Sequence, residues 1–287
     1  MTIILTALSL FAFAANSLLC RMALGNGAID PVSFTSLRLV SGMLILIPVS
    51  KLLSEPRAVS ENKGAWITGL ALFGYAFAFS LGYVTISASM GTLVLVGAVQ
   101  ITMLGWALIR GEKLSRLRWL GSAVSMGGLV YLVFPGVSSP DPVGAGLMLV
   151  SGTAWGVYSI RGRGAMAPIS MTARNFLWAA PIALLASLLA YSSLHLEPKG
   201  VLLAVCSGSV TSALGYIIWY RALRHLSTSA ASIVQLLIPV LTAFGGVLFL
   251  SEQITGRLLI ASALILGGVG MGFVKTKKPA LPGNPAI

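Results

Sequence analysis

The chain has 287 residues, of which 56% are hydrophobic and only 9% are charged. Soluble globular proteins carry about 25% charged residues, so this composition excludes a water-soluble fold and predicts that a lipid bilayer surrounds most of the chain. The net charge of +12 is high enough for a nucleic-acid-binding protein. However, the Lys and Arg residues are scattered between apolar segments, and we therefore expect no nucleic-acid partner.

Apolar segments of about 20 residues recur along the chain, and polar or proline-containing breaks separate them. Each segment is long enough to cross about 30 Å of hydrocarbon as an α-helix. We therefore predict an all-α integral membrane protein with ten transmembrane helices and a disordered cytoplasmic tail over residues 277–287. The predicted helices cover residues 3–24, 31–53, 64–84, 88–109, 116–135, 143–161, 171–191, 199–221, 227–250 and 256–275.

The basic residues predict the orientation of these helices. With the N-terminus inside, 14 of the 19 Lys and Arg residues fall in inner segments and three in outer segments, while Arg38 and Arg174 lie within helices. Positively charged residues favour the cytoplasmic side of a membrane. We therefore expect both termini to lie in the cytoplasm.

The second half of the chain repeats the first half at an offset of 140 residues. At this offset Ser122-Ala123 meets Ser262-Ala263, and Gly127-Gly128 meets Gly267-Gly268. Because the repeating unit has five helices, an odd number, the second copy must enter the membrane from the opposite side. We predict two inverted five-helix repeats, over residues 1–137 and 138–276, which is a recurring architecture of secondary transporters.

Each repeat carries an Ala-xxx-Gly pair at the same position, Ala123 with Gly127 and Ala263 with Gly267. Small residues four positions apart allow membrane helices to approach closely. We expect the fifth and tenth helices to pack through these four residues, away from the transport pathway. The alternative is that glycine is simply common in membrane helices.

The stretch from Ala230 through Pro239 to Leu250, followed by Glu252, resembles the signature of EamA-type proteins of the drug/metabolite transporter superfamily. The segments 154–156 and 31–38 also fit. The family consists of ten-helix carriers with both termini inside, so the resemblance implies export of metabolites by alternating access. The segment 80–83 is similar to bacterial exporters of aromatic and other amino acids, which implies a location in the bacterial cytoplasmic (inner) membrane.

All seven acidic residues fall in loops or at the ends of predicted helices. Carriers coupled to protons or sodium usually bury Asp or Glu near the membrane midplane. We therefore expect a carrier without a carboxylate proton relay, in which solute flows down its own gradient.

Neutral polar and aromatic side chains remain as candidates for a substrate cavity. Pro239 cannot donate a backbone hydrogen bond to the carbonyl of residue 235, which leaves that carbonyl beside the Gln235 amide. Aromatic walls with a few amides would suit partly apolar solutes; the alternative is that these residues only pack the core. The predicted cavity residues are Asn16, Ser17, Tyr75, Phe79, Tyr83, Gln100, Trp155, Tyr158, Tyr216, Trp219, Gln235 and Pro239.

Arg38 and Arg174 are the deepest charges, and each lies near the start of a helix at a similar place in its half. We expect both side chains to extend toward lipid headgroups. The alternatives are that they close a gate or contact a substrate carboxylate.

Neither histidine has a partner at a metal-ligand spacing, and no nucleophile and base are grouped. We therefore expect no metal, no cofactor and no enzymatic activity. The leading interpretation is a monomeric secondary transporter in the lipid bilayer that exports small molecules, above all amino acids of broad type including aromatic ones. The alternatives are a drug or nucleotide-sugar carrier of the same superfamily and an integral membrane enzyme that acts on lipid-linked substrates.

Overall fold

The structure, a computed structural model, describes residues 1–53, 64–133, 141–163, 165–251 and 256–273, and these residues form helices and no β-strand. The predicted tail at 277–287 lies outside the described residues. In chain order the helices are α1 (Thr2–Leu24), α2 (Pro31–Leu52), α3 (Ala65–Thr85), α4 (Ala88–Ile109), α5 (Arg116–Val133), α6 (Pro142–Gly162), α7 (Pro168–Leu189), the 3₁₀ turn η2 (Tyr191–Ser193), α8 (Pro198–Cys206), the π-helix η3 (Ser207–Leu214), α9 (Gly215–Leu223), α10 (Thr228–Gln235), α11 (Ile238–Leu250) and α12 (Gly256–Phe273).

Polar side chains in the connections fix where the helices begin. Asp30 accepts hydrogen bonds from two amides of the first turn of α2, at 3.0 and 2.9 Å, and Asp141 accepts one from the first turn of α6, at 2.7 Å. Ser87 and Ser227 cap α4 and α10 in the same way. These side chains satisfy amides that the first turn of a helix leaves without partners.

Within the described residues, eight helical stretches are long and apolar enough to cross a membrane, which identifies the chain as an integral membrane protein. Two of these stretches are interrupted. In Pro198–Leu223 the π-helix η3 separates α8 from α9, and in Thr228–Leu250 the α10 helix ends at Gln235 before α11 begins at Ile238. The second interruption divides the helix that we predicted as continuous over 227–250, and Pro239, which lacks an amide donor, lies in the first turn of α11.

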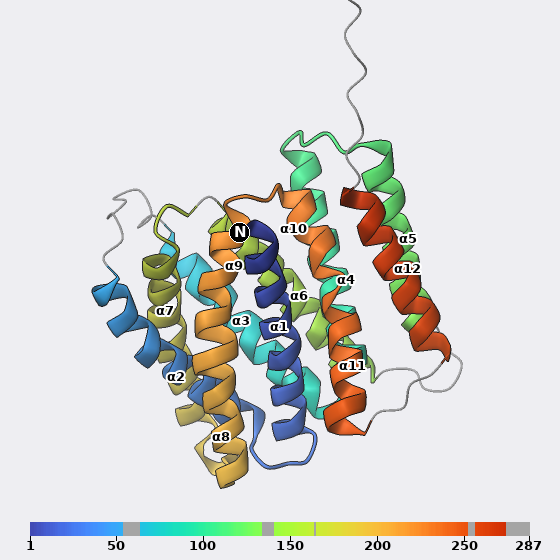
Figure 1. The fold of residues 1–287 in the computed structure, drawn as a ribbon. Helices are drawn as coiled ribbons and strands as arrows, with labels where there is room; N and C mark the ends of the chain where they lie inside the picture. The colour runs from blue at the N-terminus through green and yellow to red at the C-terminus, as the bar shows by residue number, and fades with distance from the viewer. Residues whose placement is uncertain (54–63, 134–140, 164, 252–255, 274–287) are drawn as a thin grey trace, which may run out of the picture.

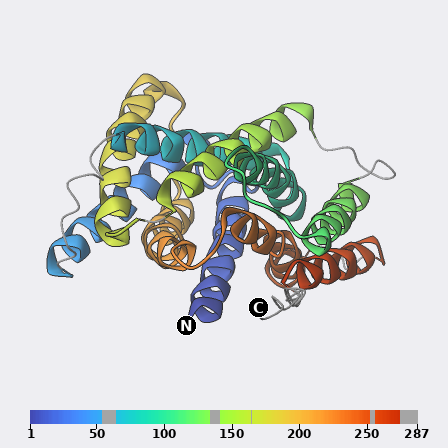
Figure 2. The ribbon, with the colours of Figure 1, turned by 90° about the horizontal axis from the view of Figure 1, so that it is seen from above.

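The helices pack in pairs that join the two halves of the chain (Figures 1 and 2). The α6 helix packs against α3 and α4, while α1 packs against α9 and α11; α2 lies against α7, and α5 against α12. The pair α5 and α12 stands at one edge of the molecule (Figure 2). The start of α1 and the last turn of α12 lie at the same end of the bundle (Figure 1).

The α5 and α12 helices do meet at small residues, but not at those we predicted. A Cβ atom on Gly128 would lie 2.9 Å from Leu264 and 3.1 Å from the Ala261 carbonyl oxygen, and one on Gly268 would lie 2.5 Å from the Gly121 carbonyl oxygen. The contact is therefore reciprocal between the two helices.

The prediction for Ala123, Gly127, Ala263 and Gly267 is wrong, because all four residues are exposed on the outer faces of this pair. The two adjacent glycines in each helix point about 100° apart, and the Ala-xxx-Gly spacing alone does not decide which of them faces the partner.

Candidate substrate site

Arg38 lies two turns into α2 and is completely buried, with 0% of its surface exposed. Its Nε donates a hydrogen bond to Ser212 Oγ at 2.9 Å, and its Nη2 donates to the hydroxyls of Tyr75 and Tyr216 at 3.1 and 2.7 Å. The guanidinium also lies 5.1 and 5.2 Å from the ring centres of Tyr75 and Phe79. Its Nη1 finds no hydrogen-bond partner among the described residues.

The expectation that Arg38 extends toward lipid headgroups is therefore wrong. The α3 and η3 elements pack against α2, and their side chains contact the guanidinium together with Tyr216 of α9. Three hydroxyl oxygens and two aromatic rings surround the guanidinium, and they replace part of its hydration.

No carboxylate of the described residues contacts Arg38. Asp30 and Asp141 cap helices at the ends of the bundle, and Glu197 lies 3.5 Å from His195 in the connection before α8. Glu112, in the connection between α4 and α5, is bound to Ser229 in the first turn of α10. The three remaining acidic residues lie outside the described residues, and they are Glu55, Glu61 and Glu252.

A glycine in the π-helix brings η3 against the backbone of Arg38. A Cβ atom on Gly208 would lie 2.1 Å from the Arg38 carbonyl oxygen and 2.1 Å from Ser41 Oγ, so no other residue fits without moving the two helices apart. This close approach allows Ser212, one turn further along η3, to reach the guanidinium. Short π-helical segments are frequent at functional sites.

The same π-helix directs two more hydroxyls toward α1. Ser207 and Thr211 donate hydrogen bonds to Asn16 Oδ1 at 2.7 and 3.1 Å. The Asn16 amide then donates to the Tyr75 hydroxyl at 3.4 Å, which also accepts from Arg38. A continuous buried network therefore connects α1, α2, α3 and η3.

An aromatic cluster adjoins this network, with Trp155 of α6 at its centre. The Trp155 indole donates to Gln235 Oε1 at 2.8 Å, and the Gln235 amide donates to the Ala231 carbonyl at 3.0 Å. The centre of the Trp155 ring lies 4.8–5.2 Å from the rings of Phe13, Tyr75, Tyr158 and Tyr216. These rings belong to α1, α3, α6 and α9, so both halves of the chain build the cluster.

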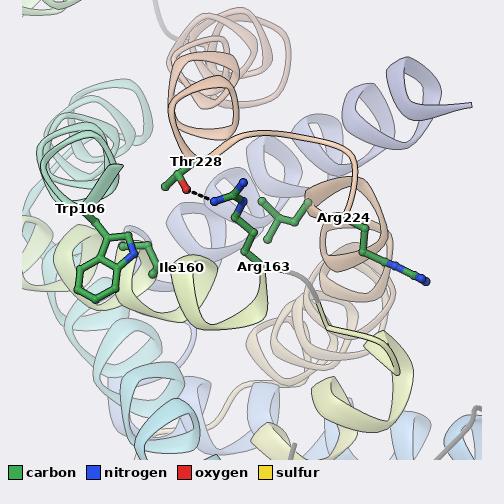
Figure 3. A pocket seen from close by; sticks show the side chains of 6 residues that line it. Trp106, Ile160, Arg163, Arg224 and Thr228 are labelled. Atoms are coloured by element: carbon green, nitrogen blue, oxygen red, sulfur yellow. Dashed lines mark hydrogen bonds between the residues drawn. The ribbon is translucent and has the colours of Figure 1, made fainter. Parts of the chain in front are cut away.

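A pocket of about 290 Å³ opens where α4, α6 and α9 end and α10 begins (Figure 3). Within it Arg163 donates to Thr228 Oγ1 at 2.6 Å, while Arg224 points away from the other lining side chains (Figure 3). The same Arg163 donates to the Leu226 carbonyl at 3.2 Å. The lining residues are Trp106, Ile160, Arg163, Leu223, Arg224 and Thr228.

Glu112 links the connection between α4 and α5 to the first turn of α10, near this pocket. Its carboxylate accepts a short hydrogen bond from the Ser229 hydroxyl and a longer one, 3.4 Å, from the Ser229 amide. Partial burial alone raises the pKa of the Glu112 carboxyl, but the hydrogen bonds from Ser229 and Ser227 and the charge of Arg163 outweigh it and hold this pKa below its ordinary value.

The EamA-like transporter family matches the chain twice, over residues 1–134 and over residues 142–273. The chain belongs to the EamA-like transporter family. The resemblance noted from the sequence is thereby confirmed, and the protein is a multi-pass membrane protein of a transporter family.

Several proteins related to this EamA-like transporter cover most of its length. It is 46% identical over 270 residues to an uncharacterized protein of Pseudomonas aeruginosa, which covers 94% of this chain and 93% of that protein. It is 28% identical over 257 residues to the threonine/homoserine exporter RhtA of Salmonella typhimurium, covering 86% and 83%. It is 23% identical over 242 residues to a probable amino-acid metabolite efflux pump of the same species, covering 79% and 81%. A solved crystal structure with 22% identity shares its fold, with a TM-score of 0.76 over 95% of this chain and 98% of that one.

The structure brings most of the predicted cavity residues of this EamA-like transporter together. Trp219 joins them through its ring, 5.6 Å from that of Phe13, and its indole donates to Ser159 at 3.2 Å. Those that meet in the network and the aromatic cluster are Asn16, Tyr75, Phe79, Trp155, Tyr158, Tyr216, Trp219 and Gln235.

Four of the predicted residues lie apart from this group. The ring of Tyr83 lies 4.6 Å from that of Phe79, and its hydroxyl pairs with Thr92 of α4. Ser17 donates to a carbonyl of its own helix, and Gln100 is buried with both amide atoms unpartnered among the described residues. Pro239 lies in the first turn of α11, directly after the helix break. Arg174, which we predicted with Arg38 as a possible gate, is half-buried on α7.

Sequence reasoning missed several residues of the site. The hydroxyl-rich segment 207–212 carried a signal in its four Ser and Thr residues, which is unusual for a membrane helix. Asn175 could have been found by aligning Pro31 with Pro168, because this alignment places it opposite Arg38. It is fully buried, and its amide donates to the Tyr220 hydroxyl at 3.4 Å.

Proposed function

We propose that this protein is a secondary transporter that exports amino acids, and that the network around Arg38 and the cluster around Trp155 form its substrate site. The observation that carries the proposal is a fully buried cation, held by hydroxyls and beside an aromatic cluster, where the two halves of the chain meet. The names of two relatives support amino acids as the solutes.

The proposal includes ten transmembrane helices in two inverted repeats, over residues 1–137 and 138–276. Three observations support it. The family matches each half separately. Exchanging each helix with its counterpart, α1 with α6 and so on to α5 with α12, leaves the main packed pairs unchanged. The α5 and α12 helices have 18 residues each, about 27 Å, which nearly spans about 30 Å of hydrocarbon.

The excess of basic residues in the inner segments supports the proposal that both termini, and therefore the pocket lined by Arg163 and Trp106, face the cytoplasm. Its volume of about 290 Å³ is near the lower end of ligand pockets, about 300 Å³. From Ile160 in this pocket to Trp155 is less than two turns of α6. The pocket is the loading side of the site, and the contacts of Glu112 and Arg163 across the connections hold its shape.

The exporter in this proposal has no carboxylate proton relay. The described carboxylates serve at helix ends and connections, where they are held by caps and loop contacts. Solute therefore leaves down its own gradient. The rings around Trp155 accommodate apolar side chains, so aromatic amino acids are included among the solutes. One chain holds both halves of the site, and the protein acts as a monomer.

A panel of labelled solutes tests this proposal. The full chain is reconstituted into proteoliposomes loaded with unlabelled solute, and counterflow of labelled L-threonine, L-homoserine, L-phenylalanine, glucose and a nucleotide sugar is followed, with protein-free liposomes as control. We expect counterflow of the amino acids and not of the sugars. Counterflow of the nucleotide sugar alone, or of no solute, would overturn the assignment. Concentrative uptake driven by a pH gradient alone would overturn the uncoupled mechanism.

A further inference from the structure

The guanidinium of Arg38 has no counter-ion among the described residues. An arginine side chain stays protonated at any physiological pH, so the charge is present inside the membrane region. A buried charge is costly unless an opposite charge or hydrogen bonds compensate it. The three acceptors of Arg38 are neutral hydroxyls, which compensate its donors but not its charge.

One side of this guanidinium is free. Nε and Nη2 donate to Ser212, Tyr75 and Tyr216, whereas Nη1 is buried and has no partner among the described residues. The two tyrosine hydroxyls accept from Arg38 and also lie within hydrogen-bonding reach of each other, so one of their two protons is left for a further acceptor. An unpaired N–H donor and a tyrosine hydroxyl therefore belong to one buried group that carries a fixed positive charge. Carboxylates accept several such hydrogen bonds, and pair with Arg in a defined geometry.

We propose that Arg38 binds the carboxylate of the transported solute, which rests on the proposed function of the site. The carboxylate accepts from Nη1 and from the hydroxyl of Tyr75 or Tyr216, and it supplies the missing negative charge. The solute's side chain lies toward the rings around Trp155, because the same Tyr75 and Tyr216 rings lie within 4.9 Å of that indole.

At the position equivalent to Arg38 the second half of the chain carries no cation, and the neighbouring Arg174 is only half-buried. In the alignment of Pro31 with Pro168, the position of Arg38 is taken by Asn175, whose buried amide is neutral and donates to Tyr220. The site therefore compensates one negative charge and not two. It selects monocarboxylates over dicarboxylates such as glutamate, whose second carboxylate would remain buried without a partner.

The test compares each acid with its amide. The unfolding temperature of the purified full-length protein is measured in detergent with L-threonine or L-threoninamide, and with L-phenylalanine or L-phenylalaninamide. All measurements use one pH and one ionic strength. The same compounds compete for counterflow of labelled L-threonine. We expect the amides to bind about 10- to 100-fold more weakly, the usual effect of losing a hydrogen-bonded charge pair. Equal binding of acid and amide by the unaltered protein would overturn the proposal without any variant.

Variants show whether the preference for acid over amide depends on Arg38. Arg38→Gln should remove the preference for acid over amide, and Arg38→Lys should retain part of it, because lysine keeps the charge but not the planar fork. Arg221→Gln removes an exposed arginine from the end of α9 and should leave the preference intact. A preference that survives in Arg38→Gln would place the carboxylate elsewhere.

Failure of the proposed transport function can be distinguished from failure of the proposed carboxylate site. If no amino acid flows through the unaltered protein, the same heating assay with propionate and propionamide decides the anion site alone. Stabilisation by propionate that is absent in Arg38→Gln would support the site, and equal effects of both compounds would overturn it.

Discussion

Gly208 offers a way to disturb the site without removing any of its chemical groups. A Cβ atom at this position would lie 2.1 Å from the Arg38 carbonyl oxygen, whereas ordinary van der Waals contact begins at 3.4 Å. The obstacle is backbone, so Gly208→Ala must move η3 and α2 apart by about 1.3 Å, the difference between these two distances. The hydrogen bonds from Arg38 to Ser212 and Tyr216, now 2.9 and 2.7 Å long, would then exceed hydrogen-bonding distance or bend.

Each hydrogen bond to a charged group contributes about 1.5–3 kcal/mol, so loss of one bond corresponds to about a 10- to 100-fold effect. We expect counterflow of labelled L-threonine by Gly208→Ala to fall at least about tenfold. The matched control is Gly74→Ala in α3, where a Cβ atom meets no atom within 4 Å. This control should transport normally and unfold at an equal or higher temperature, because alanine favours helix over glycine by about 1 kcal/mol. Normal transport by Gly208→Ala would refute the reasoning that links this approach to the site.

Three further predictions follow from other parts of the molecule. Because the pKa of Glu112 is lower in the folded protein, its contact with Ser229 stabilises the fold above the ordinary carboxyl pKa, and this contribution is lost as the pH falls through the lowered value. The unfolding temperature of the wild type minus that of Glu112→Gln should therefore shrink between pH 6 and pH 3.5, and a constant difference would contradict the assignment. Gly128→Val should lower the unfolding temperature by separating α5 from α12, whereas Gly127→Val, on the exposed face, should not; equal effects would contradict the observed face. Glutamate should compete for L-threonine counterflow at least about tenfold more weakly than glutamine, and equal competition would contradict a site for one carboxylate.

The helices could be predicted from the sequence because their causes are local. A run of apolar residues in lipid must form a helix to satisfy its own backbone, and Asp30, Ser87 and Asp141 mark the starts by capping them. The missing hydrogen bond to the carbonyl of residue 235 was also predictable, because proline lacks an amide donor, although the predicted helix ran through this position without a break.

The surroundings of Arg38 could not be predicted in this way, because they depend on contacts between distant segments. Snorkelling is a sound expectation for an arginine near the start of a membrane helix. It fails because Gly208, which lies 170 residues further along the chain, admits η3 to the backbone of α2 and brings Ser212 to the guanidinium. The face of α5 that meets α12 was missed for a related reason, since Gly127 and Gly128 look equivalent until the partner helix is in place.

The central claim is that the solute binds at the cluster around Trp155. The most direct measurement is counterflow of labelled L-threonine by Trp155→Ala, with Trp119→Ala as the matched control, because Trp119 is 47% exposed on α5. The unfolding temperature of each variant is measured in the same detergent. We predict that Trp155→Ala reduces counterflow at least about tenfold while remaining folded, since it removes the ring at the centre of the cluster and the partner of Gln235. Counterflow by folded Trp155→Ala at the rate of the wild type and of Trp119→Ala would contradict the claim.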